Sequence, residues 1–99
     1  MDLKGEKLRL DLLPWDALEE VAKVFMFGAK KHEPNGWKKI SDAIPVYRQA
    51  TGRHFSSIMQ GNDIDEESGL MAEAHACADL LIVIAKRLEI ARVSERVTT

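Results

Sequence analysis

Residues 66 to 85, EESGLMAEAHACADLLIVIA, decide the fold class that the sequence predicts. The run from Leu80 to Ala85 is apolar at six successive positions, so it covers every face of a helix. A helix that is apolar on every face must be covered on every face. Glu73, His75 and Asp79 lie within two turns upstream, and burying such polar groups without partners is costly. The stretch therefore predicts a buried helix that begins with a polar site.

Helical spacing of apolar residues continues along the rest of the chain. We expect helices over about residues 14–31, 45–60 and 69–92, because Pro14 and Pro45 both suit the first position of a helix. The sequence has no strand alternation, internal repeat or low-complexity segment. The expected fold is therefore all-α, a compact helical domain of three main helices.

Chain length sets the expected number of domains and the expected assembly. The 99 residues are enough for one domain, with its core between about residues 8 and 92. Residues 1–13 are expected to be irregular, with leucines as anchors onto that core. These leucines are Leu8, Leu10, Leu12 and Leu13. Two other helices can hardly cover a third that is apolar all round, so we expect a homo-oligomer, a dimer or larger, packed through the third helix.

Composition and cysteine content indicate a compartment and exclude some partners. Hydrophobic residues make up 45% and charged residues 30%, which is typical of soluble globular proteins. The formal net charge of -2 argues against a generic nucleic-acid or membrane binder. No apolar segment reaches the roughly 18 residues of a membrane span, and no signal peptide is apparent. Cys77, expected to be a small core residue, cannot form a disulfide within the chain, so we infer a cytosolic protein.

Cations gather in the first half and middle of the chain, whereas residues 63–67 are acidic. The candidate phosphate ligands are Lys30, Lys31, Lys38, Arg48 and Arg53. Arg53 is the strongest of them, because a planar guanidinium suits a phosphate, although a plain surface arginine is equally compatible. A cationic patch that faces an acidic one fits a phosphate with a metal ion. Ordinary solvated charge explains the same pattern.

The histidines and one tryptophan are further candidates. His75 and Asp79 lie four residues apart, so they share one side of a helix and could hold a metal ion or fix an imidazole tautomer. A helix-stabilising pair or a satisfied core histidine is the plainer interpretation. His54 falls on the apolar face of the second helix and is expected to be partly buried. Trp37, in a loop beside Lys38, either stacks a nucleotide base or plugs the end of a core.

Four stretches in order resemble a known family: LRLDLLPWDALEEVAKVFMFGAKKH, NGW, YRQATGRHF, and GNDIDEESGL followed by AHA. The resemblance covers about residues 8–85 and is to the dATP/dGTP diphosphohydrolase N-terminal domain family of phages. It implies an all-α nucleotide pyrophosphohydrolase with magnesium, similar to MazG-like enzymes, that binds purine nucleoside triphosphates and releases pyrophosphate. The sequence departs from the pattern at Ala72, where relatives often carry a second histidine.

Two functions of different classes follow from the resemblance together with the residues. In an enzyme, Mg²⁺ would be held by carboxylates and the phosphates by cations, while Trp37 stacks the purine. The expected metal ligands are Glu19, Glu20, Glu67 and Asp79, and the expected catalytic residues are His54, His75 and Asp79. In a sponge, the chain holds a signalling nucleotide of host immunity without turnover, which the loss at Ala72 favours. A helical module that binds only a partner protein would take no nucleotide.

Overall fold

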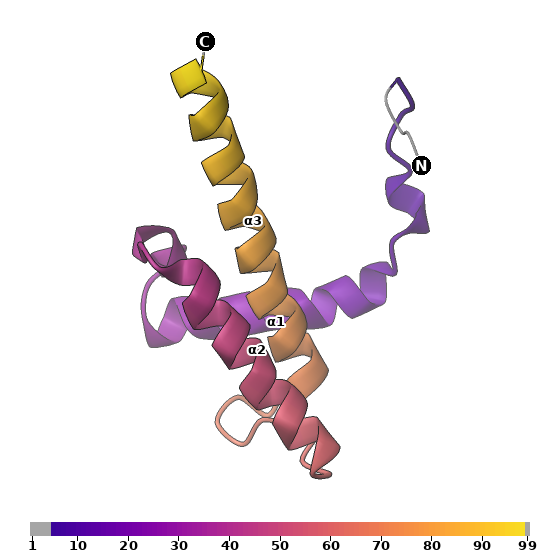
Figure 1. Cartoon of the computed structure of the whole chain (residues 1–99). Helices are drawn as coiled ribbons and strands as arrows, with labels where there is room; N and C mark the ends of the chain where they lie inside the picture. Colours follow the sequence, from indigo (N-terminus) through magenta and orange to yellow (C-terminus); the bar gives the residue numbers. More distant parts are fainter. Residues whose placement is uncertain (1–4, 99) are drawn as a thin grey trace.

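The computed structural model describes residues 5–98 and is built from helices (Figure 1). The elements are the 3-10 helix η1 (Leu10–Leu12), α1 (Trp15–Lys31), the 3-10 helix η2 (Gly36–Lys39), α2 (Ala43–Met59) and α3 (Ala72–Thr98). Extended pairing within the described residues is limited to an isolated antiparallel bridge between Ile64 and Met71. The prediction of an all-α fold with three main helices is confirmed.

The helix bounds differ from the predicted ones for local reasons. The α2 helix begins two residues before Pro45, which lies in its first turn, where a missing N–H leaves no helical hydrogen bond unmade. The α3 helix begins at Ala72 rather than near residue 69, because Gly69 has a φ of +72° and belongs to a turn. It continues beyond residue 92 because no glycine or proline follows to end it.

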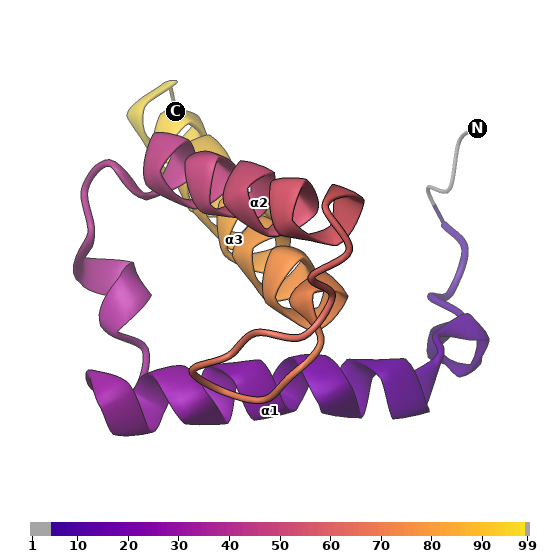
Figure 2. The ribbon, with the colours of Figure 1, turned by 90° about the horizontal axis from the view of Figure 1, so that it is seen from below.

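The helices form a pair with a third helix across it. The α2 and α3 helices run side by side in opposite directions, and α1 crosses them (Figures 1 and 2). The core joins Val21 of α1 to Ala74 and Ala78 of α3, with Val24 and Phe25 packed against them. The small alanine side chains let α1 approach α3 closely. The loop between α2 and α3 extends toward α1 (Figure 2), which sets polar loop residues beside the helix crossing.

The apolar run of α3 is only partly covered by the single chain. Ile82 and Val83 are buried, whereas Leu80, Leu81 and Ile84 are exposed. The expected core position of Cys77 is wrong for the single chain, because its side chain lies on an exposed face of α3. None of the helices within residues 5–98 combines the length and apolar character needed to cross a membrane.

The expectation that the N-terminal leucines anchor onto the core is also wrong. Residues 1–4 lie outside the described residues, and the following segment projects away from the helices as an arm (Figure 1). Leu8 is 81% exposed and Leu12 is 71% exposed, and Leu10 and Leu13 are exposed as well. The core offers these side chains no surface, because α1 runs on for five turns with its N-terminal end beyond the α2–α3 pair.

Candidate functional site

A cavity of about 860 Å³ lies among α1, η2, α2 and α3. Its volume falls in the roughly 300–1,000 Å³ range of small-molecule sites. The apolar lining includes Phe25, Trp37, Tyr47 and Ile82. The polar lining includes Lys31, Arg53, His54, Asp65, Glu67, His75 and Asp79. Such a wall of apolar surface with a few convergent polar groups is typical of a ligand site.

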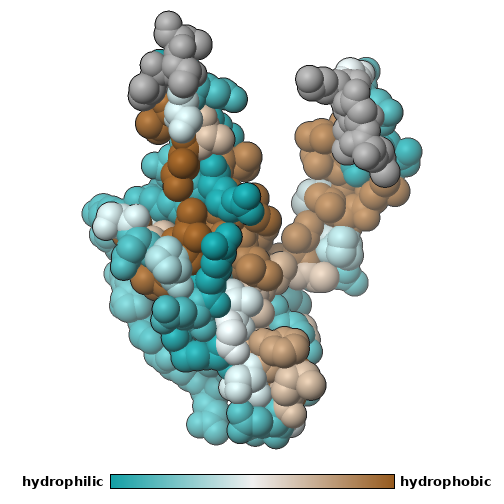
Figure 3. Space-filling view, in the orientation of Figure 1, coloured by the Kyte–Doolittle hydropathy of each residue, from teal (hydrophilic) through white to brown (hydrophobic). Residues whose placement is uncertain are grey.

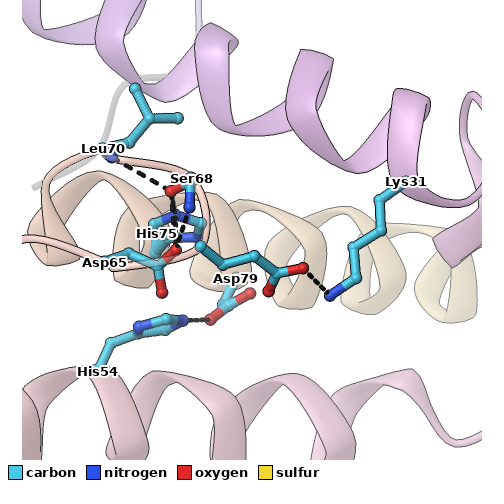
Figure 4. A network of polar contacts seen from close by, with 8 residues as sticks. Lys31, His54, Asp65, Ser68, Leu70, His75 and Asp79 are labelled. Carbon is cyan, nitrogen blue, oxygen red and sulfur yellow. Dashed lines mark hydrogen bonds and ion pairs between the residues drawn. The ribbon is translucent and has the colours of Figure 1, made fainter.

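Two histidines from neighbouring helices stack in this cavity. The rings of His54, from α2, and His75, from α3, lie 4.9 Å apart between centroids, at 24° between planes. Each faces one carboxylate: His54 Nε2 lies 3.7 Å from Asp79 Oδ2, and His75 Nε2 lies 3.6 Å from Asp65 Oδ2. Figure 4 shows these four side chains converging from α2, α3 and the loop before α3.

Ser68 fixes the tautomer of His75. The Ser68 hydroxyl donates to Asp65 Oδ2 at 2.8 Å, and its oxygen accepts the Leu70 N–H at 3.2 Å. Ser68 Oγ also lies 2.7 Å from His75 Nε2. A hydroxyl has one proton, and that proton is committed to the carboxylate, so His75 must donate from Nε2. The neutral ring of His75 therefore keeps its lone pair on Nδ1.

The surroundings shift the pKa values of several groups that line the cavity, among them Asp65, His54 and Asp79. Burial raises the pKa of Asp65, but hydrogen bonds from the Ser68 N–H and hydroxyl, with the nearby histidines, bring it below its usual value. Burial, then His75 and Arg53, lower the pKa of His54, against an opposing effect of Asp65. Burial raises the pKa of Asp79 to about 6, against an opposing effect of Arg53.

Asp79 is a largely buried carboxylate with one oxygen that lacks a hydrogen-bond partner among the described residues. Its side chain is only 14% exposed, and Oδ2 is a buried oxygen without a hydrogen bond among the described residues. A buried carboxylate oxygen of this kind is costly unless a donor or a cation reaches it. Asp79 is thus chemically suited to contact a bound ligand or ion from the cavity wall.

The cations at the cavity differ in how far they are neutralised. Lys31 Nζ lies 2.7 Å from Glu67 Oε1, so this lysine already has an acidic partner. Arg53 lines the cavity, is exposed, and makes no hydrogen bond or ion pair with any other residue between 5 and 98. Its guanidinium is therefore available to an anionic ligand in the cavity.

The structure brings some of the predicted site residues together and leaves others apart. Those that line the cavity are Lys31, Trp37, Arg53, His54, Glu67, His75 and Asp79. Those that lie outside it are Glu19, Glu20, Lys30, Lys38 and Arg48. Glu20 instead pairs with Lys23 on α1 at 2.7 Å, and the ammonium of Lys38 lies 5.7 Å from the ring of Trp37. Across residues 5–98, no three His, Cys, Asp or Glu side chains form a group that could hold a metal ion.

Asp65 and Ser68 lie in the stretch that carries the family resemblance, but the sequence assigned no role in the site to them or to Tyr47. The sequence does carry a signal for the first two, because an aspartate three residues before a serine, followed by glycine, is typical of a side-chain-capped turn. Tyr47 lies on α2 and lines the cavity. Burial and then Asp79 raise its pKa, which places its phenol as a neutral donor at the cavity wall.

Comparison with known families identifies the chain. The model of the family described as dATP/dGTP diphosphohydrolase, N-terminal, matches residues 2–96. The chain belongs to this family. The resemblance noted in the sequence is thereby confirmed over nearly the whole chain.

One similar protein is much longer than this chain. The chain is 32% identical over 77 residues to a dATP/dGTP diphosphohydrolase of Salmonella phage PMBT28. The match covers 78% of this chain and 26% of that protein, so the chain spans about a quarter of the length of its relative. No solved structure gives a significant match.

Proposed function

We propose that this family member binds a purine nucleoside triphosphate in the cavity and hydrolyses it to the nucleoside monophosphate and pyrophosphate. A purine deoxynucleoside triphosphate is the proposed substrate, in line with the name of the phage relative. The observation that carries the proposal is one cavity that combines an aromatic ring, Trp37, with an unpaired cation, Arg53, and a histidine of fixed tautomer, His75.

Binding is divided between the base and the phosphates. Trp37 is half-buried at η2 and supplies an aromatic face on which a purine stacks. Arg53 meets phosphate oxygens with its planar fork, and Lys31 joins it when the phosphates compete with Glu67 for the ammonium. The triphosphate therefore lies toward α2 and α3, near the two histidines.

His75 serves as the general base. Its Nδ1 lone pair takes a proton from water, the water oxygen bonds to the α-phosphorus, and the bond from that phosphorus to the bridging oxygen breaks. Pyrophosphate leaves with the electrons of that bond. Asp65 and Ser68 act through His75, because they hold the proton on Nε2 and leave Nδ1 free. His54 stacks on His75 and limits its movement.

Only two of the four predicted magnesium ligands line the cavity, so Mg²⁺ would have few protein ligands there. Glu67 and Asp79 line it, and Mg²⁺ is commonly held by one or two carboxylates together with substrate phosphates. Glu19 and Glu20 are left out of the proposed site because they lie outside the cavity. A bound Mg²⁺ would supply positive charge that offsets charge developing on the phosphates.

A sponge that holds a signalling nucleotide without turnover is the second candidate. The observation that favours it is the pairing of Glu67 with Lys31, because it leaves Asp79 as the one proposed metal ligand in the cavity that has no lysine or arginine ion pair among the described residues. Trp37 and Arg53 would serve a sponge equally well, since binding needs no activated water.

The remaining partners and the compartment belong to the same proposal. We propose that the chain forms a homo-oligomer through the exposed residues of α3, that it requires neither a membrane nor nucleic acid, and that it acts in the cytoplasm, the host's if a phage encodes it. Leu81 and Ile84 are the α3 side chains on which this assembly rests, since both are exposed in the single chain.

The Arg53 prediction tests where the phosphates bind. Arg53→Lys keeps the charge but loses the fork, so it should weaken nucleotide affinity by roughly 1 to 3 kcal/mol, the scale of a charge-assisted hydrogen bond. Arg53→Ala should cost at least as much, and its loss should shrink at high salt, where screening weakens the attraction. Calorimetric titration with a panel of purine nucleoside triphosphates and Mg²⁺ measures both changes.

Arg48→Ala is the matched control. Arg48 is an exposed arginine on the same helix, but it lies outside the cavity. Its replacement should leave affinity within a factor of about two, since a single distant surface charge contributes little. Equal losses for Arg48→Ala and Arg53→Ala, or no loss for either, would remove the phosphates from the proposed position.

A further inference from the structure

The single chain exposes more surface than a folded monomer of its mass. Its accessible surface is 7920 Å², whereas a monomer of 11.1 kDa is expected to expose about 5,700 Å². Its radius of gyration is 15.7 Å, against about 13 Å for a compact domain of 100 residues. The chain therefore carries an excess of roughly 2,200 Å² of surface over the expected value.

Two apolar projections extend from the packed part of the molecule. One is the arm, which we define as residues 5–14, with exposed Leu8, Leu10, Leu12 and Leu13. The other is the part of α3 between residues 80 and 93, where Leu81, Ile84, Leu88, Ile90 and Val93 are exposed. Figure 3 shows the two as separate prongs with apolar surface toward one another across an open gap.

The arm is held in shape although its leucines touch no core. Trp15 Nε1 donates to the Leu10 carbonyl at 3.1 Å. The Arg9 guanidinium donates to both oxygens of Asp11, at 2.9 and 2.7 Å. The arm continues directly into α1, so its position relative to α3 is set by the packing of α1 on α3. A shaped arm with exposed leucines is suited to receive another apolar surface.

We infer that the gap between the arm and α3 is filled by the α3 helix of a second copy of this chain. In a two-fold dimer each α3 enters the partner's gap, so each arm clasps the α3 helix of the other copy. One contact then covers both projections on both chains. The excess of roughly 2,200 Å² per chain is of the size that obligate homodimers bury, and well above the about 800 Å² per partner of a standard interface.

Photo-cross-linking tests the clasp. A benzophenone amino acid replaces Leu12, and this full-length chain is mixed with a ¹⁵N-labelled wild-type chain, so that links between copies differ in mass from links within one. We expect cross-links from position 12 to ¹⁵N peptides within residues 80–93. A benzophenone at Gln49, exposed on α2, is the control and should give no such links. Links only within one chain, only to other peptides, or none would overturn the inference.

A pair of substitutions tests the energetic role of the arm. Leu8→Asp with Leu12→Asp should raise the dimer dissociation constant by at least about 30-fold, the effect of one interface hot spot. Both side chains are exposed, so helicity by circular dichroism should be unchanged. Lys7→Asp changes charge on the same arm and should alter the constant by less than about threefold. A monomeric wild type in light scattering, or equal effects of both variants, would overturn the inference.

Discussion

His75→Ala should lower turnover of a purine nucleoside triphosphate by about 100-fold or more, the contribution of a positioned general base. The KM should change little, because His75 acts on the attacking water rather than on the bound nucleotide. Its side chain is only 12% exposed and bonded through Nε2 to the loop, so the change also removes packing, and stability must be measured beside turnover. Steady-state kinetics and a thermal melt of the same sample measure both effects.

Ser68→Ala separates the proposed role of His75 from a structural one. Without Ser68 Oγ, His75 Nε2 loses the acceptor that holds its proton, so turnover should fall with His75 still present. Asp65→Asn should act in the same direction, since it removes the carboxylate that takes the Ser68 proton. Should His75→Ala unfold the protein, or leave turnover intact, His75 is a core histidine with its hydrogen bonds satisfied and the base is elsewhere.

Asp79→Asn should stabilise the folded chain at neutral and higher pH. Burial raises the pKa of Asp79 from 3.8 to about 6. A shift of about two units corresponds to up to about 3 kcal/mol in the free energy of unfolding. The buried charge is the cause of this cost, so an amide that carries no charge should recover most of it at pH 8. Denaturant unfolding in a chelating buffer, free of metal and nucleotide, measures the change.

The stability advantage of Asp79→Asn over wild type should increase as the pH rises from 3.8 to about 6. Below pH 3.8 the Asp79 carboxyl is protonated in both the folded and unfolded states, so the variant has no advantage. Between pH 3.8 and about 6 only the unfolded state releases its proton, and wild-type stability falls as pH rises. Above about pH 6 the difference in unfolding free energy between wild type and variant is constant. A gap that grows toward low pH would contradict this expectation.

The fold could be predicted from sequence where the signal is local. The apolar run from Leu80 to Ala85 and the prolines at 14 and 45 located the three helices to within a few residues, except for the C-terminal end of α3, which runs on to Thr98. The position of the arm could not be predicted in this way. Leucines in an irregular segment give the same sequence pattern whether they pack on the core or on another surface. Only the position of α1 shows that the core is out of their reach (Figure 2).

In the candidate site, too, local spacing was predictable from the sequence, whereas contacts between distant residues were not. Spacing placed His75 and Asp79 on one helix side, but it could not show that Asp79 faces His54 while His75 faces Asp65. Those contacts depend on the loop before α3 folding back beside the α2–α3 pair, through bonds among Asp65, Ser68 and Leu70. Glu19 and Glu20 had a suitable chemistry for metal binding, but the rotation of α1 about its axis keeps them out of the cavity.

Identification of the reaction products shows whether the protein hydrolyses a purine nucleoside triphosphate or only binds it. The protein is incubated with each purine nucleoside and deoxynucleoside triphosphate and Mg²⁺ and then denatured, and the released molecules are identified by chromatography and mass spectrometry. We expect a purine nucleoside monophosphate and pyrophosphate in equal amounts from wild type, and about 100-fold slower conversion by His75→Ala. Intact nucleotide that co-purifies with wild-type protein would contradict hydrolysis and leave the sponge, and no bound or altered nucleotide would contradict both.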